Sequence, residues 1–207
     1  FNERPYRVSM VPTNNVQGVL VYFHGASNLP LRRNSIVDEL IRFSTREGFI
    51  LVQPSGSIDC EVLGLKSNQR RICWDLRSPE KELDYVHELL GHLQKKFAFS
   101  LKTQKAVGYS NGGYLFGAAL QRNQLNEWSE VGVLAGGNVG TKSATPVKGP
   151  KTFIEVGRRD TWQLEPSRLL INALKDLNPR PSYREVDAGH EVSWQRMRSF
   201  LEWWHRE

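Results

Sequence analysis

The chain has 207 residues, of which 39% are hydrophobic and 24% are charged, and its formal net charge at pH 7 is +6. This length allows one sizeable core but not two comfortable domains, and the apolar fraction excludes a wholly disordered protein. No apolar run approaches the length of a transmembrane helix, so we expect a soluble globular protein without a membrane span.

The hydrophobic pattern predicts strands that alternate with helices along the chain. In order, the predicted elements are strands at 6–10 and 16–23, a helix at 34–47, a strand at 49–54, an irregular segment at 55–78, a helix at 80–97, a strand at 105–109, a helix at 111–122, a strand at 130–137 followed by a Gly/Thr/Pro-rich loop, a strand at 151–157, a helix at 166–177, a strand at 182–187 and a helix at 193–205. Such alternation over short joints predicts a mostly parallel central sheet with helices on both faces. We therefore predict a single α/β domain that spans residues 1–207.

Two cysteines, Cys60 and Cys73, flank the polar stretch EVLGLKSNQRRI. The chain has no CxxC pair and no His/Cys cluster with zinc spacing, so we predict neither a metal site nor a cofactor. A disulfide between the two would stabilise the fold by about 3 kcal/mol, and two reduced thiols are the alternative. The disulfide would indicate a periplasmic or secreted protein. A chain that begins at Phe1 fits a mature exported protein and a trimmed one equally well.

The positive charge is scattered in pairs such as Arg70/Arg71 and Arg158/Arg159. Because no long basic run or RNA-binding motif is present, we interpret these pairs as a solvated surface and expect no nucleic-acid partner. The alternative is a basic rim that attracts an anionic substrate or polymer.

The stretch GYSNGG, residues 108–113, places Ser110 between a predicted strand and a predicted helix. The glycines at 108 and 112 allow the backbone to turn sharply there, which would lift the serine hydroxyl above the sheet. The N–H of Asn111 would then lie at a helix N-terminus, where negative charge is stabilised. We predict that Ser110 is a catalytic nucleophile.

A nucleophilic serine needs a base, which is usually a histidine held by a carboxylate. His190 and His24 both follow predicted strands, at the edge where open α/β sheets bind ligands. We prefer His190 as the base, because His24 is better placed to shape its own loop. Asp160 follows the strand at 151–157, and we prefer it as the carboxylate over Asp187 and Asp75. The resulting chain order, serine, aspartate and histidine, is typical of α/β-hydrolases.

Four motifs in this order, FHGAS, GYSNGG, GRRD and AGH, resemble the α/β-hydrolase superfamily. Within it, ELDYVHELLGHLQKKF and KAVGYSNGGYLFGAAL resemble the secreted polyhydroxybutyrate-depolymerase and feruloyl-esterase group. The resemblance extends from about Gly18 to the end of the chain.

The resemblance implies a role for each matching residue. Ser110 would be the nucleophile, His190 the general base and then acid, and Asp160 the residue that orients the histidine. The backbone N–H groups of Ala26 and Asn111 would form the oxyanion hole. Because both donors belong to the backbone, we expect side-chain identity to matter little at these two positions.

No inserted cap domain separates GYSNGG from GRRD, so we expect an open cleft with room for a bulky or polymeric substrate. Trp74, Trp162 and Trp194 lie near the predicted site, and we expect at least one of them to contact substrate. Ordinary packing is the alternative for each ring.

These observations predict a serine esterase that acts through an acyl-enzyme on small-molecule or polymeric carboxylic esters, with feruloyl, acetyl and polyhydroxyalkanoate esters as candidates. An amidase or peptidase with the same triad is the first alternative. An inactive hydrolase-fold binding module is the second.

Overall fold

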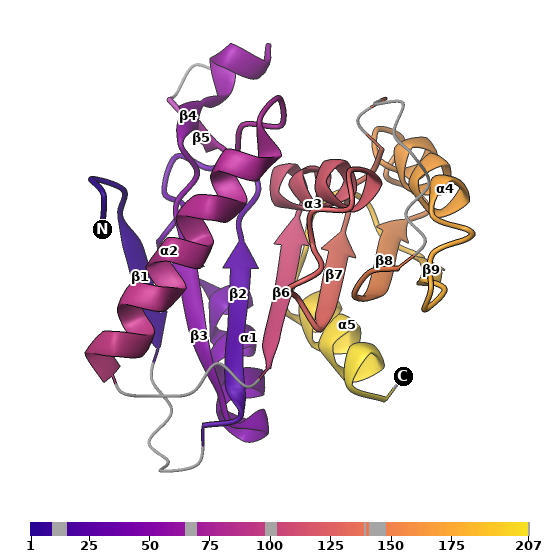
Figure 1. Ribbon diagram of the computed structural model, residues 1–207. Helices are drawn as coiled ribbons and strands as arrows, with labels where there is room; N and C mark the ends of the chain where they lie inside the picture. The colour runs from indigo at the N-terminus through magenta and orange to yellow at the C-terminus, as the bar shows by residue number, and fades with distance from the viewer. Residues whose placement is uncertain (10–15, 65–69, 98–102, 139, 141–147, 207) are drawn as a thin grey trace.

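A central sheet runs through the protein, and the described part of the chain gives it seven strands in the order β1-β3-β2-β6-β7-β8-β9 (Figure 1). The structure, a computed structural model, describes residues 1–9, 16–64, 70–97, 103–138, 140 and 148–206. The strands are β1 (Tyr6–Ser9), β2 (Gly18–Phe23), β3 (Phe49–Pro54), β6 (Gln104–Tyr109), β7 (Glu130–Leu134), β8 (Lys151–Gly157) and β9 (Ser182–Val186). β1 is antiparallel to β3, and the remaining pairs are parallel. The predicted mostly parallel sheet is confirmed.

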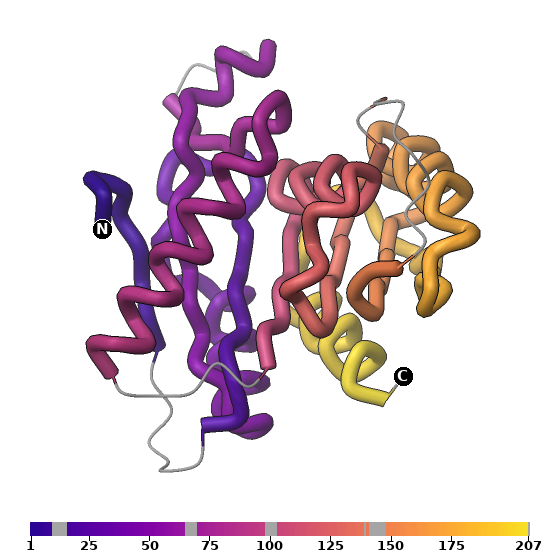
Figure 2. The backbone as a smooth tube through the Cα atoms, in the orientation of Figure 1, coloured from indigo at the N-terminus to yellow at the C-terminus, as the bar shows by residue number. Residues whose placement is uncertain are grey.

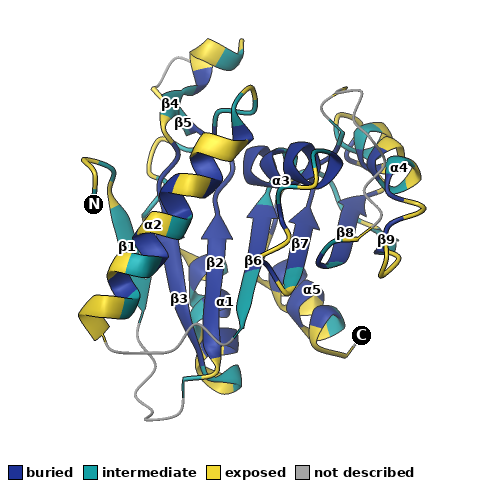
Figure 3. Ribbon diagram, in the orientation of Figure 1, coloured by how far each residue is buried: buried dark blue, intermediate teal, exposed yellow. Residues whose placement is uncertain are grey.

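Helices cover both faces of the sheet. Helices α1 (Ser35–Glu47) and α5 (Trp194–Arg206) lie on one face, and α2 (Pro79–Phe97), α3 (Asn111–Gln121) and α4 (Leu164–Ala173) lie on the other (Figure 1). Every residue of β2 and β3 is buried, as expected for strands covered on both sides (Figure 3). Helix α1 has clear ends, because the Asn34 side chain accepts the N–H of Val37 at 3.0 Å and Gly48 ends the helix with a φ of 74°.

Several boundaries differ from those predicted. The segment at 55–78 contains a small antiparallel pair, β4 (Ile58–Asp59) and β5 (Ile72–Cys73), and a short 3₁₀ helix, η1 (Cys60–Leu63). Strand β7 ends at Leu134, three residues early, because Ala135 adopts a φ of 49°, which a strand does not accommodate. Helix α4 starts at Leu164 and ends at Ala173, earlier than predicted at both ends. Met10 and most of the Gly/Thr/Pro-rich loop lie outside the described residues.

The topology brings four joints together at the carboxyl edge of the sheet. The loops after β2, β6, β8 and β9 all leave this edge, and the segment with β4, η1 and β5 stands above it (Figure 2). Between Ser110 and Asp160, the described residues form only α3, β7, β8 and connecting loops, without a cap of inserted helices. The described residues therefore place no inserted cap over the edge where the predicted site residues meet.

Candidate active site

The chain makes a sharp, strained turn at Ser110. Strand β6 ends at Tyr109 and α3 begins at Asn111, and the serine between them has a φ of 53°, which is rare for a residue with a side chain. A Cβ added at Gly108 would lie 2.4 Å from the carbonyl oxygen of Gly112, so a larger residue at position 108 would clash with backbone. The predicted strand–turn–helix arrangement is present.

Ser110, His190 and Asp160 form a continuous hydrogen-bonded chain. The Ser110 Oγ lies 3.1 Å from Nε2 of His190, and Nδ1 of His190 lies 2.7 Å from Oδ2 of Asp160. The Asp160 side chain is fully buried, and its Oδ1 also accepts the backbone N–H of Gln163 at 3.3 Å. A carboxylate on Nδ1 holds the proton there, which leaves Nε2 free to accept the serine proton. The three residues predicted to act together are brought together, although they are far apart in the sequence.

The competing carboxylates lie elsewhere. Asp187 is exposed and forms an ion pair with Arg159 at 3.3 Å. Asp75 binds Arg77 at 2.8 Å, and the guanidinium beside it holds the pKa of that carboxyl below its usual value. Neither is hydrogen-bonded to the imidazole of His190.

His24, the competing histidine, is occupied by backbone. Its Nδ1 donates to the carbonyl of Gly25 at 2.6 Å, and its Nε2 accepts the N–H of Gly56 at 3.0 Å. Burial lowers the pKa of His24 to about 4, so the ring is neutral at ordinary pH. Because both ring nitrogens are used, His24 holds the loop that leads to Ala26 and is not available to Ser110.

The two predicted oxyanion donors both lie close to Ser110. Ala26 and Asn111 both line the cleft that contains the serine, and a Cβ added at Gly25 would lie 3.1 Å from the Ser110 Cβ, so the two loops are in close contact. Within the described residues, no backbone carbonyl accepts the N–H of Ala26. Asn111 is the first residue of α3, and its N–H has no acceptor in its own helix.

The Asn111 side chain matters more than predicted. Asn111 is buried, its Oδ1 accepts the backbone N–H of Trp74 at 2.6 Å, and its Nδ2 donates to the Trp74 carbonyl at 3.4 Å. The side-chain amide of Asn111 thus binds both the N–H and the carbonyl of Trp74. The expectation that side-chain identity is unimportant at this position is wrong, because removing the amide leaves a buried N–H without a partner.

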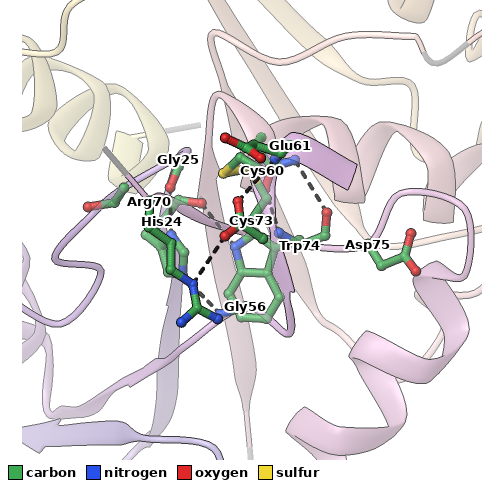
Figure 4. Close-up of a disulfide and its surroundings, with 12 residues drawn as sticks. His24, Gly25, Gly56, Cys60, Glu61, Arg70, Cys73, Trp74 and Asp75 are labelled. Carbon is green, nitrogen blue, oxygen red and sulfur yellow. Dashed lines mark hydrogen bonds and ion pairs between the residues drawn. A yellow bond between two sulfur atoms is a disulfide. The ribbon is translucent and has the colours of Figure 1, made fainter. Parts of the chain in front are cut away.

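The predicted disulfide between Cys60 and Cys73 is present, with Cα atoms 5.0 Å apart (Figure 4). The disulfide does not place the neighbouring Trp74 in the described lining of the cleft. The Trp74 ring is fully buried, its Nε1 donates to the carbonyl of His24 at 2.9 Å, and it packs against Phe23. For Trp74 the structure shows the alternative given for each ring, ordinary packing, because the indole is part of the core.

The other two tryptophans differ from each other. Trp162 lines the cleft beside the triad and is 83% exposed. Trp194 is absent from the described cleft lining and packs under the guanidinium of Arg198, 4.9 Å from the ring centre. The cleft has a volume of about 700 Å³, and its apolar lining includes Leu63 and Leu76.

Comparison with solved structures identifies the fold. A carboxylesterase from Mesorhizobium loti is similar with a TM-score of 0.72 and 18% identity, over 99% of this chain and 95% of that one. The Bacillus cereus carboxylesterase gives a TM-score of 0.71 and 16% identity, over 99% and 94%. Acyl-protein thioesterase 2 from Zea mays gives 0.67 and 12%, over 98% of each chain. The protein has the α/β-hydrolase fold. No protein-family model and no curated protein sequence matches the chain.

Sequence reasoning missed two groups that hold the histidine in this α/β-hydrolase fold. The Tyr109 hydroxyl donates to the carbonyl of His190 at 3.0 Å. Arg196, from α5, donates through Nη1 to the carbonyls of Gly189 and Glu191, at 2.8 and 3.2 Å, on either side of the histidine. Tyr109 stands inside the serine motif and was a visible signal. Arg196 gave none, because an arginine in an amphipathic helix is usually solvated.

A buried carboxylate fixes Arg196 in turn. Glu155, in the middle of β8, is fully buried and accepts Nε of Arg196 at 2.9 Å and Nε of Arg184 at 2.7 Å. A glutamate inside a buried strand is the one sequence signal that could have revealed this network, because a buried charge needs a partner.

The described residues contain no cluster of three His, Cys, Asp or Glu side chains that could hold a metal ion. Nor does any helix among them have the length and apolar character required to cross a bilayer.

Proposed function

We propose that the protein hydrolyses carboxylic esters, with Ser110 as nucleophile, His190 as general base and acid, and Asp160 as its orienting carboxylate. The observation that carries the proposal is the hydrogen-bonded chain from Asp160 through His190 to Ser110 on a strained turn. The fold supports it, since solved structures that share it include proteins named as carboxylesterases.

The geometry supports the following sequence of steps. His190 Nε2 takes the hydroxyl proton as the Ser110 oxygen bonds to the ester carbonyl carbon, and the carbonyl electron pair moves to oxygen. The N–H groups of Ala26 and Asn111 stabilise that oxyanion, each worth about 2.7–4 kcal/mol in comparable sites. The electron pair returns, the alkoxide leaves with the proton from Nε2, and an acyl-enzyme remains. Water, deprotonated by the same nitrogen, then releases the acid and restores Ser110.

The proposal also extends to the acyl group that the cleft accepts. The open cleft of about 700 Å³ and the exposed Trp162 suit a bulky or aromatic acyl chain. We extend the proposal to feruloyl, acetyl and polyhydroxyalkanoate esters as the first compounds to screen. The disulfide between Cys60 and Cys73 supports an oxidising location, in the periplasm or outside the cell.

The test is burst release of p-nitrophenol from short-chain acyl esters, together with labelling of the serine by a fluorophosphonate and mass spectrometry. Ser110→Ala is expected to lose activity by about 10⁴-fold or more and to lose the label. Ser129→Ala is the matched control, because that exposed serine lies at the amino end of β7 and away from the cleft. Folded wild-type protein that shows neither burst nor label would overturn the proposal in favour of an inactive binding module. Faster turnover of p-nitroanilides than of esters would favour an amidase.

A further inference from the structure

The charge of the cleft is uneven. Among the described residues that line it, Arg71 has the only permanent charge, and no Asp or Glu is present. Burial raises the pKa of Tyr109 and of Tyr114, each to about 12, so both phenols in the lining are neutral at ordinary pH. A single guanidinium therefore sets the local charge in a cleft that also contains Ser110.

The backbone at Arg71 is firmly attached to the loop that leads to the oxyanion donor. The Arg71 carbonyl accepts the N–H of Cys60 at 2.9 Å. The next residue, Ile72, exchanges two hydrogen bonds with Ser27, at 2.7 and 3.2 Å, and Ser27 directly follows Ala26. The disulfide of Cys73 fixes the other end of this short strand. The base of the arginine side chain is thus held in a constant position relative to the reacting centre.

The neighbouring arginine shows that this placement is specific. Arg70 is 79% exposed, is absent from the described cleft lining, and binds Asp59 through Nε at 3.1 Å (Figure 4). Of these two adjacent arginines, only Arg71 belongs to the described lining of the cleft. The pair offers a natural comparison in which the net charge is the same.

A guanidinium in such a setting favours a particular kind of substrate. Its planar set of N–H donors matches the two oxygens of a carboxylate, and the apolar side chains of Leu63 and Leu76 in the same lining reduce screening by water. We propose that Arg71 makes this cleft selective for esters that carry a carboxylate group in addition to the ester to be cleaved. This inference rests on the proposed ester hydrolysis and names its substrate class.

The experiment compares matched esters on wild type, Arg71→Gln and Arg70→Gln. Monomethyl adipate against methyl hexanoate tests a carboxylate on the acyl side, and 4-acetoxybutanoate against butyl acetate tests one on the alcohol side. Arg71→Gln is expected to lower kcat/KM for at least one carboxylate ester about tenfold more than for its neutral partner, the size of one charged hydrogen bond. Arg70→Gln should leave this ratio unchanged, and 0.5 M salt should reduce it in wild type.

Equal loss for carboxylate and neutral esters, or equal effects of the two arginine variants, would overturn the inference while ester hydrolysis stands. If wild type hydrolyses no ester, the proposed function fails separately, and calorimetric titration with adipate then decides the inference. If Ser110→Ala binds adipate and Ser110→Ala/Arg71→Gln binds it at least tenfold more weakly, the result would support a carboxylate site. Binding of equal strength in both, or no binding in either, would overturn it.

Discussion

Arg196 is expected to control activity without touching substrate, and substitution by lysine tests this. Lysine keeps the positive charge beside Glu155. Its single ammonium lacks the rigid fork that lets one guanidinium bind the buried carboxylate and the carbonyls of Gly189 and Glu191 together. We therefore expect Arg196→Lys to keep the ion pair and to release the loop that carries His190.

The magnitude follows from the contacts that are lost. A hydrogen bond from a charged donor contributes about 1.5–3 kcal/mol net of the water bonds it replaces, and we expect lysine to lose one of the two. A loss of about 1.5–3 kcal/mol in the placement of His190 corresponds to a decrease in kcat of about 10- to 160-fold. KM should change little, because Arg196 does not belong to the described lining of the cleft.

The assay is steady-state ester hydrolysis with thermal unfolding of the same samples. Arg184→Lys is the matched control, because Arg184 binds the same Glu155 carboxylate and its contacts with Ser199 and the ring of Trp203 lie on α5, away from the His190 loop. We expect Arg184→Lys to lower the melting temperature and to keep kcat within about twofold of wild type, which is the spread of ordinary surface substitutions. A similar kcat for the two variants, or an activity loss in Arg196→Lys that only follows the unfolded fraction, would refute a positioning role.

Three further outcomes are expected. Burial lowers the pKa of His24 to about 4, while the unfolded chain takes up this proton near pH 6.5. The free energy of unfolding should therefore fall by up to about 3 kcal/mol as the pH decreases from 6.5 to 4. Urea titrations at several pH values should find a weaker dependence of this free energy on pH in His24→Asn. Serine at both Cys60 and Cys73 should lower the free energy of unfolding by about 3 kcal/mol, and a reductant should have the same effect on wild type but none on the variant. Trp162→Ala should leave the melting temperature nearly unchanged, because the ring is exposed, and raise KM for aromatic acyl esters more than for acetyl esters.

The parts of the site that were predictable are those with local causes. A serine whose backbone must bend sharply needs small neighbours, so Gly108 and Gly112 reveal the turn at Ser110 without any knowledge of the sheet. Asp160 and His190 could be found because parallel strands end at a common edge and each residue follows a strand. In each case the information lies within a few residues of the motif.

The parts that were missed depend on contacts between distant segments. Trp74 follows a cysteine in a polar stretch, and nothing near it in the sequence shows that its ring fills the core beside Phe23. The partners of Arg196 are equally distant, since Glu155 stands 41 positions away on the central sheet. Hydrophobic pattern places a helix on a sheet, but it does not tell which charged side chain of that helix reaches a buried partner.

These distant contacts form a frame around the proposed oxyanion hole. The Asn111 amide binds the backbone of Trp74, the Trp74 indole binds the carbonyl of His24, and the His24 ring binds Gly56 and the loop that leads to Ala26. The two amides proposed to stabilise the oxyanion thus belong to one continuous set of buried hydrogen bonds, although they come from separate loops. Such donors act only if they are already oriented when charge develops. In the proposed reaction, the buried indole would therefore contribute more by holding these loops from below the cleft than by forming a wall of it.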